Sequence, residues 1–341
     1  MIPAAPLPLQ PAAWQAQWRD AVREPAELLA LLGLERLGER ISAAASRQFA
    51  LRVPRAFIAR MRHGDANDPL LRQVLPLDDE ERIVPGFALD AVGDAAAKAA
   101  DGVIHKYHGR ALLIATGSCA VNCRYCFRRH FPYADETAAR GGWAQAVAAI
   151  AADESIEEVL LSGGDPLSLA TSKLAELTDQ LAAIPHIKRL RIHTRLPVVL
   201  PARVDDELGR WLAALRWPLA VVIHANHANE FDAEVDAALA RLRAAGAQLL
   251  NQAVLLSGVN DSLDALAALS ARSFAAGVLP YYLHQLDRVA GAAHFEVDDA
   301  RALELHRQLA ARLSGYLVPK LVREVAGDSG KRALHHANTA N

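Results

Sequence analysis

The chain has 341 residues, a formal net charge of −2 and 52% hydrophobic residues. This composition is typical of a globular protein and excludes a disordered chain. The balanced charge argues against a nucleic acid or an anionic membrane as the main partner. No apolar run reaches the roughly 18 residues of a membrane span, and the N-terminus lacks the pattern of a signal peptide. We therefore expect a cytoplasmic protein.

Residues 1–104 combine helical patterns with a stretch rich in Pro and Asp, and they predict an N-terminal helical extension or cap. Residues 105–315 contain six short apolar runs that predict buried parallel strands. These runs are residues 111–116, 157–163, 188–194, 219–225, 249–256 and 279–286. After the first, they recur about every thirty residues with helical patterns between them, which is the length of a βα unit.

The predicted fold is therefore α/β, a partial barrel of six βα units with functional loops at the carboxyl ends of the strands. A doubly wound open sheet is the alternative. Residues 316–341 form a C-terminal segment with a polar tail.

The three cysteines of the chain, Cys119, Cys123 and Cys126, lie in the loop after the first predicted strand with the spacing CxxxCxxC. Three thiols suit neither a disulfide framework nor a closed tetrahedral zinc site. A [4Fe-4S] cluster held by three thiolates leaves one iron without a protein ligand, and a small molecule can be activated there. Structural zinc with His130 as a fourth ligand, and buried thiols without a metal, remain alternatives.

The cysteine spacing, with the aromatic Tyr125 before the last cysteine, resembles the radical S-adenosylmethionine superfamily. Gly163, Gly164 and Asp165 end the second predicted strand and are similar to the superfamily motif that binds the methionine amino group. The resemblance implies that Cys119, Cys123 and Cys126 hold a [4Fe-4S] cluster whose open iron binds S-adenosylmethionine.

Further motifs narrow the resemblance. These are "CRYCFRRHF", "SGGDPL", "TRLPVVLPARV", "NHANE", "NQAVLLSGVND", "LSGYLVPKL" and "GDSGK". Together they resemble the lysine 2,3-aminomutase family, from about residue 45 to Lys331. The resemblance implies an isomerase that converts L-lysine to (R)-β-lysine, with pyridoxal phosphate as a further cofactor.

The resemblance also implies roles for residues that bind pyridoxal phosphate. Lys331 matches the catalytic lysine that binds this cofactor covalently, and the alternative is a solvated lysine in a flexible tail. Arg110, Lys106, Tyr107 and Gln252 match the surroundings of the cofactor. An ion pair on a helix is the alternative for Arg110 and Lys106.

Three residues match positions that bind the substrate. Arg128 matches the arginine that binds the α-carboxylate, and a planar guanidinium suits that group. Asp287 and Glu324 match two acids that meet the distal ammonium of lysine, although Glu324 stands where the family has an aspartate. Arg129 is expected to be a structural or surface arginine.

The chain is shorter than the catabolic lysine enzymes and has no cysteines for their additional zinc site. It resembles the short proteins that make (R)-β-lysine for the modification of elongation factor P. This implies a functional link to elongation factor P and its lysine ligase, and an electron donor such as flavodoxin or ferredoxin; a homo-oligomer is left open. The alternatives are an aminomutase for glutamate or another amino acid, and a non-catalytic iron–sulfur or zinc module.

Overall fold

A ten-stranded sheet forms the centre of the protein, for which the computed structural model describes residues 13–133, 139 and 141–335. The strands follow one another across the sheet in chain order. They are β1 (Lys98–Ala100), β2 (Val103–Tyr107), β3 (Arg110–Thr116), β4 (Glu158–Gly163), β5 (Arg189–Thr194), β6 (Leu219–Ile223), β7 (Gln248–Val254), β8 (Leu279–His284), β9 (Lys320–Arg323) and β10 (Arg332–Ala333). Neighbours from β3 to β9 are parallel, whereas β1, β2 and β10 pair antiparallel.

This strand order confirms the predicted partial barrel. The two edges of the sheet are β1 and β10, which do not pair with each other, so the sheet stays open. The doubly wound alternative is wrong, because that fold reverses its strand order at a switch point. The six predicted strands correspond to β3–β8, and β9 adds a further parallel strand that the sequence analysis missed because its four residues begin with Lys and end with Arg.

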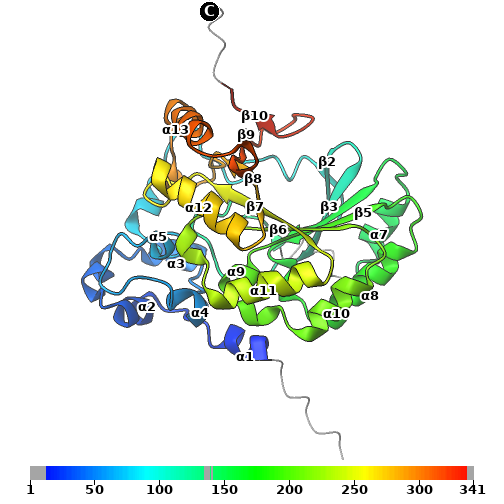
Figure 1. Ribbon diagram of the computed structural model, residues 1–341, viewed down its shortest axis with the longest axis horizontal. Coiled ribbons are helices and arrows are strands. Elements are labelled where there is room, and N and C mark those ends of the chain that lie inside the picture. The colour runs from blue at the N-terminus through cyan, green and yellow to red at the C-terminus, as the bar shows by residue number, and fades with distance from the viewer. Residues whose placement is uncertain (1–12, 134–138, 140, 336–341) are drawn as a thin grey trace, which may run out of the picture.

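Helices cover the outer side of the sheet (Figure 1). The longer ones are α7 (Ala144–Ala151), α8 (Thr171–Ala182), α10 (Asp206–Ala214), α11 (Ala233–Ala244), α12 (Leu263–Ala275) and α13 (Asp299–Arg312). In α8, Leu174, Leu177 and Leu181 are buried at helical spacing. Four of these helices begin after an Asp or Ser whose side chain caps the first turn. No helix within the described residues is both long and apolar enough to cross a membrane.

Short helical segments connect the strands, and 3₁₀ helices are labelled η. They are η3 (Pro166–Ser168), α9 (Leu196–Val199), η4 (Pro201–Arg203), η5 (Ala228–Glu230), η6 (Ala293–Phe295) and η7 (Gly315–Leu317). Most of them follow the carboxyl ends of strands, which is where the functional loops were predicted.

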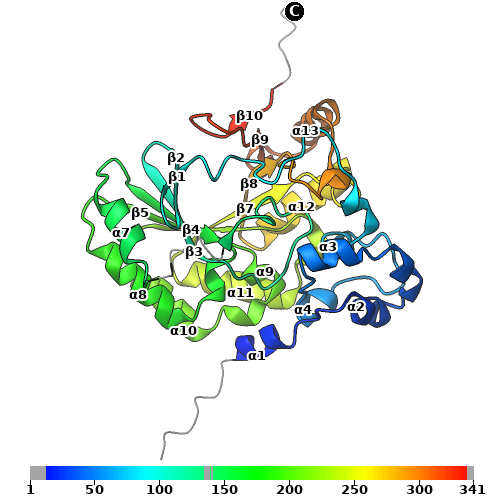
Figure 2. The ribbon, with the colours of Figure 1, turned by 180° about the vertical axis from the view of Figure 1, so that it is seen from behind.

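The N-terminal part consists of short helices that lie together at one side of the barrel (Figure 2). They are α1 (Ala13–Arg19), α2 (Pro25–Leu32), η1 (Glu35–Arg40), α3 (Ala43–Gln48), α4 (Arg55–Ile58), α5 (Pro69–Arg72) and η2 (Asp78–Glu81). Leu28 and Phe57 of this part belong to the same apolar core as Leu161 and Leu196 of the barrel. The predicted boundary at residue 104 lies inside β2. The division into three regions stays a prediction.

Glu80 fixes the N-terminal part to the cysteine loop. Its carboxylate accepts two hydrogen bonds from Arg124, at 2.7 and 2.6 Å, and one from Arg129 at 2.5 Å. The side chains of Glu80, Arg124 and Arg129 are at most 1% exposed. The pairing explains why both arginines tolerate burial, and it confirms that Arg129 is structural.

Two glycines let the end of β4 approach the same loop. Gly163 has a φ of 116°, and a Cβ added there would lie 2.5 Å from Thr116 O. A Cβ on Gly164 would lie 2.4 Å from Ser118 O and 2.8 Å from the backbone carbon of Gly117. At Gly164 the obstructing atoms are backbone atoms of the cysteine loop, so a side chain there would push this loop away.

Replacing Glu80 by Ala leaves two buried guanidinium groups without their carboxylate. We expect the free energy of unfolding to fall by about 3–5 kcal/mol, measured by urea denaturation of the metal-free chain. The control is Asp78→Ala, because the ion pair of Asp78 with Arg40 is roughly half exposed and its loss should fall within experimental error. Equal effects of the two substitutions would contradict this account of Glu80.

Replacing Gly164 by Ala should displace the loop that carries the cysteines. We expect the variant to bind less than half of the wild-type iron per chain after anaerobic reconstitution. Gly209→Ala is the matched control, since nothing lies within 4 Å of a Cβ at that helical position, and its iron content should equal that of the wild type. Normal iron binding by the Gly164 variant would refute the steric argument.

Candidate functional site

One cavity of about 290 Å³ lies inside the curve of the sheet and extends to the carboxyl ends of the parallel strands. It is lined by every residue that the sequence analysis assigned to the site. These are Lys106, Tyr107, Arg110, Cys119, Cys123, Cys126, Arg128, Gly163, Gly164, Asp165, Gln252, Asp287, Glu324 and Lys331. The roles of these residues stay predictions, but their positions in one cavity agree with a common site.

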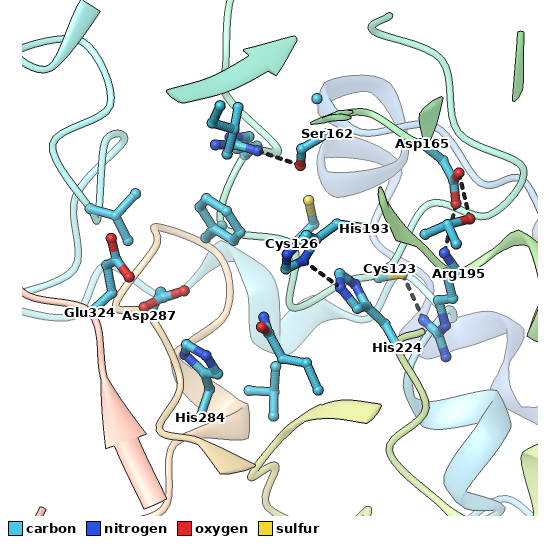
Figure 3. Close-up of a pocket in the computed structure, with 18 of the residues that line it drawn as sticks. Cys123, Cys126, Ser162, Asp165, His193, Arg195, His224, His284, Asp287 and Glu324 are labelled. Carbon is cyan, nitrogen blue, oxygen red and sulfur yellow. Dashed lines mark hydrogen bonds between the residues drawn. The ribbon is translucent and has the colours of Figure 1, made fainter. Parts of the chain in front are cut away.

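The lining falls into two groups (Figure 3). Cysteines and their neighbours form one side, and acids with a histidine form the other. In the figure the first group includes Cys123, Cys126, Asp165 and Arg195, and the second includes His284, Asp287 and Glu324. A site with two such ends suits two different bound groups.

The cysteine end contains all three thiols, which are free and partly buried. The His130 ring makes other contacts, since Nε2 lies 3.0 Å from Ala290 O and Nδ1 lies 3.4 Å from the side-chain nitrogen of Gln48. Both ring nitrogens therefore have partners other than a metal ion. These contacts disfavour His130 as a fourth ligand of zinc.

Asp165 organises the adjacent strand ends. Its Oδ1 accepts from Thr194 Oγ1 at 2.7 Å and from Leu167 N at 3.1 Å. Its Oδ2 accepts from the backbone nitrogens of Arg195 and Leu196 at 2.7 and 3.0 Å. The carboxylate therefore holds the end of β4 against the loop after β5, next to the cysteines.

Lys331 lies at the opposite end, directly before β10. Its Nζ is 2.9 Å from His284 Nε2 and 3.4 Å from Glu324 Oε2. Burial lowers the pKa of Lys331, and the negative charges of Glu324 and Asp287 oppose that shift. A lysine with 22% of its side chain exposed, which also lines the cavity, does not fit the flexible-tail alternative.

The two predicted acids differ in their surroundings. Glu324 Oε1 accepts from Tyr107 Oη at 2.5 Å and lies 3.6 Å from Lys106 Nζ. Burial favours a raised pKa for Glu324, but Lys331 and Tyr107 outweigh it and lower the pKa. Asp287 has a buried Oδ1 without a hydrogen-bond partner in the described structure. Burial raises the pKa of Asp287 to about 7 against the opposing charge of Lys331.

Cationic side chains approach the cavity from β2, β3 and the cysteine loop. Arg110 lies on β3 with its guanidinium 4.5 Å from the centre of the Tyr107 ring. Within the described residues it makes no ion pair, so its charge is available to an anion. The alternative for Arg110 and Lys106, an ion pair on a helix, is wrong about the helix, because both residues lie on strands. Lys106 does form an ion pair, with Asp94.

Asp94 joins two of the predicted cations. It lies 2.7 Å from Arg128 Nε and 2.7 Å from Lys106 Nζ. Burial favours a raised pKa for Asp94, but the two cations outweigh it and lower the pKa. Arg128 also donates to Ser162 Oγ at 3.3 Å. Asp94 was missed in the sequence analysis because its pairing spans 34 residues to Arg128.

Three histidines were also missed. His193 Nδ1 lies 3.3 Å from His224 Nε2, and His193 Nε2 is buried without a partner in the described structure. Burial lowers the pKa of His193 and His284, and it lowers that of His224 to about 3, so these rings are neutral at pH 7. All three lie at or just after the ends of β5, β6 and β8. Because functional loops were expected at the carboxyl ends of the strands, this position could have identified them from the sequence.

The residues fit the cofactors that the motifs imply. Three thiols beside a close-packed glycine pair suit a cluster with one open iron. A buried amine with a lowered pKa suits covalent bonding to an aldehyde, and Arg110 suits its phosphate. Gln252 has a buried Oε1 without a partner in the described structure, which leaves an acceptor facing the cavity.

The chain is similar in sequence to two L-lysine 2,3-aminomutases. An L-lysine 2,3-aminomutase of Escherichia coli (strain K12) is 50% identical over 322 residues, which cover 94% of each chain. An L-lysine 2,3-aminomutase of Haemophilus influenzae is 45% identical over 331 residues, 97% of this chain and 98% of the relative. A solved radical SAM methyltransferase from Sphaerobacter thermophilus is 20% identical, covers 65% of this chain and 68% of its own, and has a TM-score of 0.45.

A comparison with models of protein families finds no match. The assignment therefore rests on the two aminomutases, each of which is matched over nearly its whole length. The chain belongs to the lysine 2,3-aminomutase family.

Proposed function

We propose that the protein converts L-lysine to (R)-β-lysine. The observation that carries this proposal is one cavity lined by three cysteines, by the half-buried Lys331 and by Asp287, whose Oδ1 has no hydrogen-bond partner in the described structure. The relatives that are matched over nearly their whole length bear the name L-lysine 2,3-aminomutase. The proposal therefore joins family membership to the chemistry of the lining residues.

The carboxyl group of Asp287 favours a cationic group on the substrate at this end of the cavity. Asp287 has a pKa of about 7 because its ionised form is poorly solvated. An ammonium group next to it would stabilise the ionised form, whereas the side-chain carboxylate of glutamate would oppose it. This favours lysine over the glutamate alternative.

The residues would divide the work as follows. When bound, the iron–sulfur cluster and S-adenosylmethionine supply a hydrogen-abstracting radical, and pyridoxal phosphate supplies the conjugated system through which the amino group moves. Cys119, Cys123 and Cys126 would hold the cluster. Lys331 would anchor pyridoxal phosphate, and Arg110 would bind its phosphate.

The substrate would be held at both ends. Arg128 would bind the α-carboxylate. Asp94 accepts a hydrogen bond from Arg128 Nε and so orients the Arg128 guanidinium. Asp287 would bind the distal ammonium. Glu324 already contacts Tyr107 and Lys331. We therefore assign it two roles: it orients Lys331, and it adds negative charge to this end of the cavity. Holding both ends places the β-carbon at one position, which a hydrogen transfer requires.

We further propose that the product serves the modification of elongation factor P in the cytoplasm, together with a lysine ligase. This step rests on the resemblance of the chain to the short proteins with that role, on the acid pair Asp287 and Glu324, and on the lack of cysteines beyond the three of the loop. Reduction of the cluster would require a small electron-transfer protein such as flavodoxin or ferredoxin.

The proposal is tested with the reconstituted protein, S-adenosylmethionine, pyridoxal phosphate and a reductant. We expect β-lysine from L-lysine and none from L-glutamate, measured by chromatography of the products. Asp287→Asn should lower kcat/KM for L-lysine about 10- to 100-fold, because a charge-assisted hydrogen bond is lost. Asp264→Asn is the control, since its side chain is 89% exposed. Absence of β-lysine, or faster turnover of L-glutamate than of L-lysine, would contradict the proposal.

The raised pKa of Asp287 gives a prediction for stability. The carboxyl titrates at about 7 in the folded chain and near 3.8 when unperturbed. Between these values the folded chain binds more protons than the unfolded chain, so the contribution of this group to stability falls as pH rises. From pH 5 to pH 8 we expect a loss of about 2–3 kcal/mol relative to Asp287→Asn, which does not titrate.

This loss is measured by urea denaturation of both proteins, free of pyridoxal phosphate and lysine. Subtracting the two pH profiles removes the contribution of all other groups that titrate equally in both. Parallel profiles would show that Asp287 is ionised in the folded chain across this range.

A further inference from the structure

Arg195 reaches the cysteine end of the cavity from the loop after β5. Its Nη1 donates to Cys123 Sγ at 2.7 Å and to Tyr125 Oη at 2.8 Å. Figure 3 shows the first of these contacts as a dashed line. The residue belongs to the motif "TRLPVVLPARV", and the proposed function gives it no role.

A buried network fixes the orientation of this guanidinium. Nη2 of Arg195 donates to Gln73 Oε1 at 2.7 Å and to Glu230 Oε2 at 3.1 Å. Asn226 Nδ2 donates to Gln73 Oε1 at 3.0 Å and to Tyr125 Oη at 2.7 Å. Arg195 is 6% exposed, and Gln73 and Glu230 are fully buried. A cation fixed in this way has little freedom to move away from the sulfur.

Tyr125 takes part in the same network. Its hydroxyl oxygen accepts from Arg195 Nη1 at 2.8 Å and from Asn226 Nδ2 at 2.7 Å. Tyr125 therefore helps to hold the Arg195 guanidinium beside Cys123.

The arginines near the other cysteines are bonded elsewhere. Arg52 donates to the backbone oxygen of Cys119 at 3.1 Å. Arg128 pairs with Asp94, and Arg129 pairs with Glu80. Among the described residues, Cys123 is thus the cysteine whose sulfur contacts a guanidinium.

We infer that Arg195, with Tyr125, is a positioning residue that orients the Cys123 thiolate and raises the reduction potential of the cluster it helps to hold. Donors to a ligating sulfur stabilise the more negative, reduced state and so raise the potential. The inference rests on the cluster of the proposed function but is independent of which amino acid is the substrate.

The test is a potentiometric titration of the anaerobically reconstituted full chain, without S-adenosylmethionine or L-lysine, followed by the absorbance of the cluster. Arg195→Gln should lower the potential, so that the ratio of oxidised to reduced cluster at a fixed potential rises about tenfold, or 59 mV for one electron. Arg195→Lys keeps the charge and should show a smaller shift. Full iron content with an unchanged potential in Arg195→Gln would overturn the inference.

Two further variants keep the test decisive. If Arg195→Gln fails to bind iron because Glu230 loses its partner, Tyr125→Phe removes only the hydroxyl and should lower the potential by a smaller amount. An unchanged potential in that variant would also overturn the inference. Arg203→Lys is the matched control, because Arg203 is fully buried and donates to Leu167 O at 2.7 Å. It should lower the unfolding temperature and leave the potential unchanged.

These results separate the inference from the proposed function. If the Arg195 variants have a lowered potential but the wild type makes no β-lysine, the role of Arg195 is supported and L-lysine as the substrate is contradicted. β-Lysine formation with an unchanged potential in the variants would support the substrate and contradict the role of Arg195.

Discussion

The cysteine loop depends on the pairing of buried charges. Glu80 binds Arg124 and Arg129, which lie within and just after the cysteine motif. Glu230 binds Arg195, which contacts Cys123 Sγ. An unpaired buried charge at either of these positions would cost several kcal/mol. Removing one partner of a pair therefore disturbs the cysteine loop. The loop is therefore held in place by two carboxylates that lie far from it in sequence.

The far end of the cavity departs from this rule. Asp287 lies in the same kind of low-dielectric surroundings, but its Oδ1 has no partner in the described structure. The free-energy cost of ionising it is expressed in its pKa of about 7. An unpaired carboxyl among paired charges is suited to a cationic ligand that supplies the missing partner. Glu324, by contrast, already has partners. The two acids therefore differ, although the sequence analysis gave them the same role.

Strand positions and the residues of the cavity were predictable from the sequence. Runs such as "ALLIAT" are apolar because parallel strands are buried on both faces, so β3–β8 could be located. The predicted cysteine loop and Lys331 line one cavity. By contrast, Glu80 and Asp94 could not be identified, because an ordinary acidic residue acquires its role only from partners such as Arg124 and Arg128. The short strands β9 and β10 lack a pattern long enough to be recognised.

The N-terminal part is a component of the site and more than a cover for the barrel. It supplies Gln73 and Glu80 to the networks around the cysteines. The segment that follows it supplies Asp94, which fixes Arg128 and Lys106 at 2.7 Å each. Arg128 is predicted to hold the substrate and Lys106 to lie near the phosphate of the cofactor. One carboxylate thus sets the distance between two cations of the site, and an error of about 1 Å there is enough to slow an atom transfer.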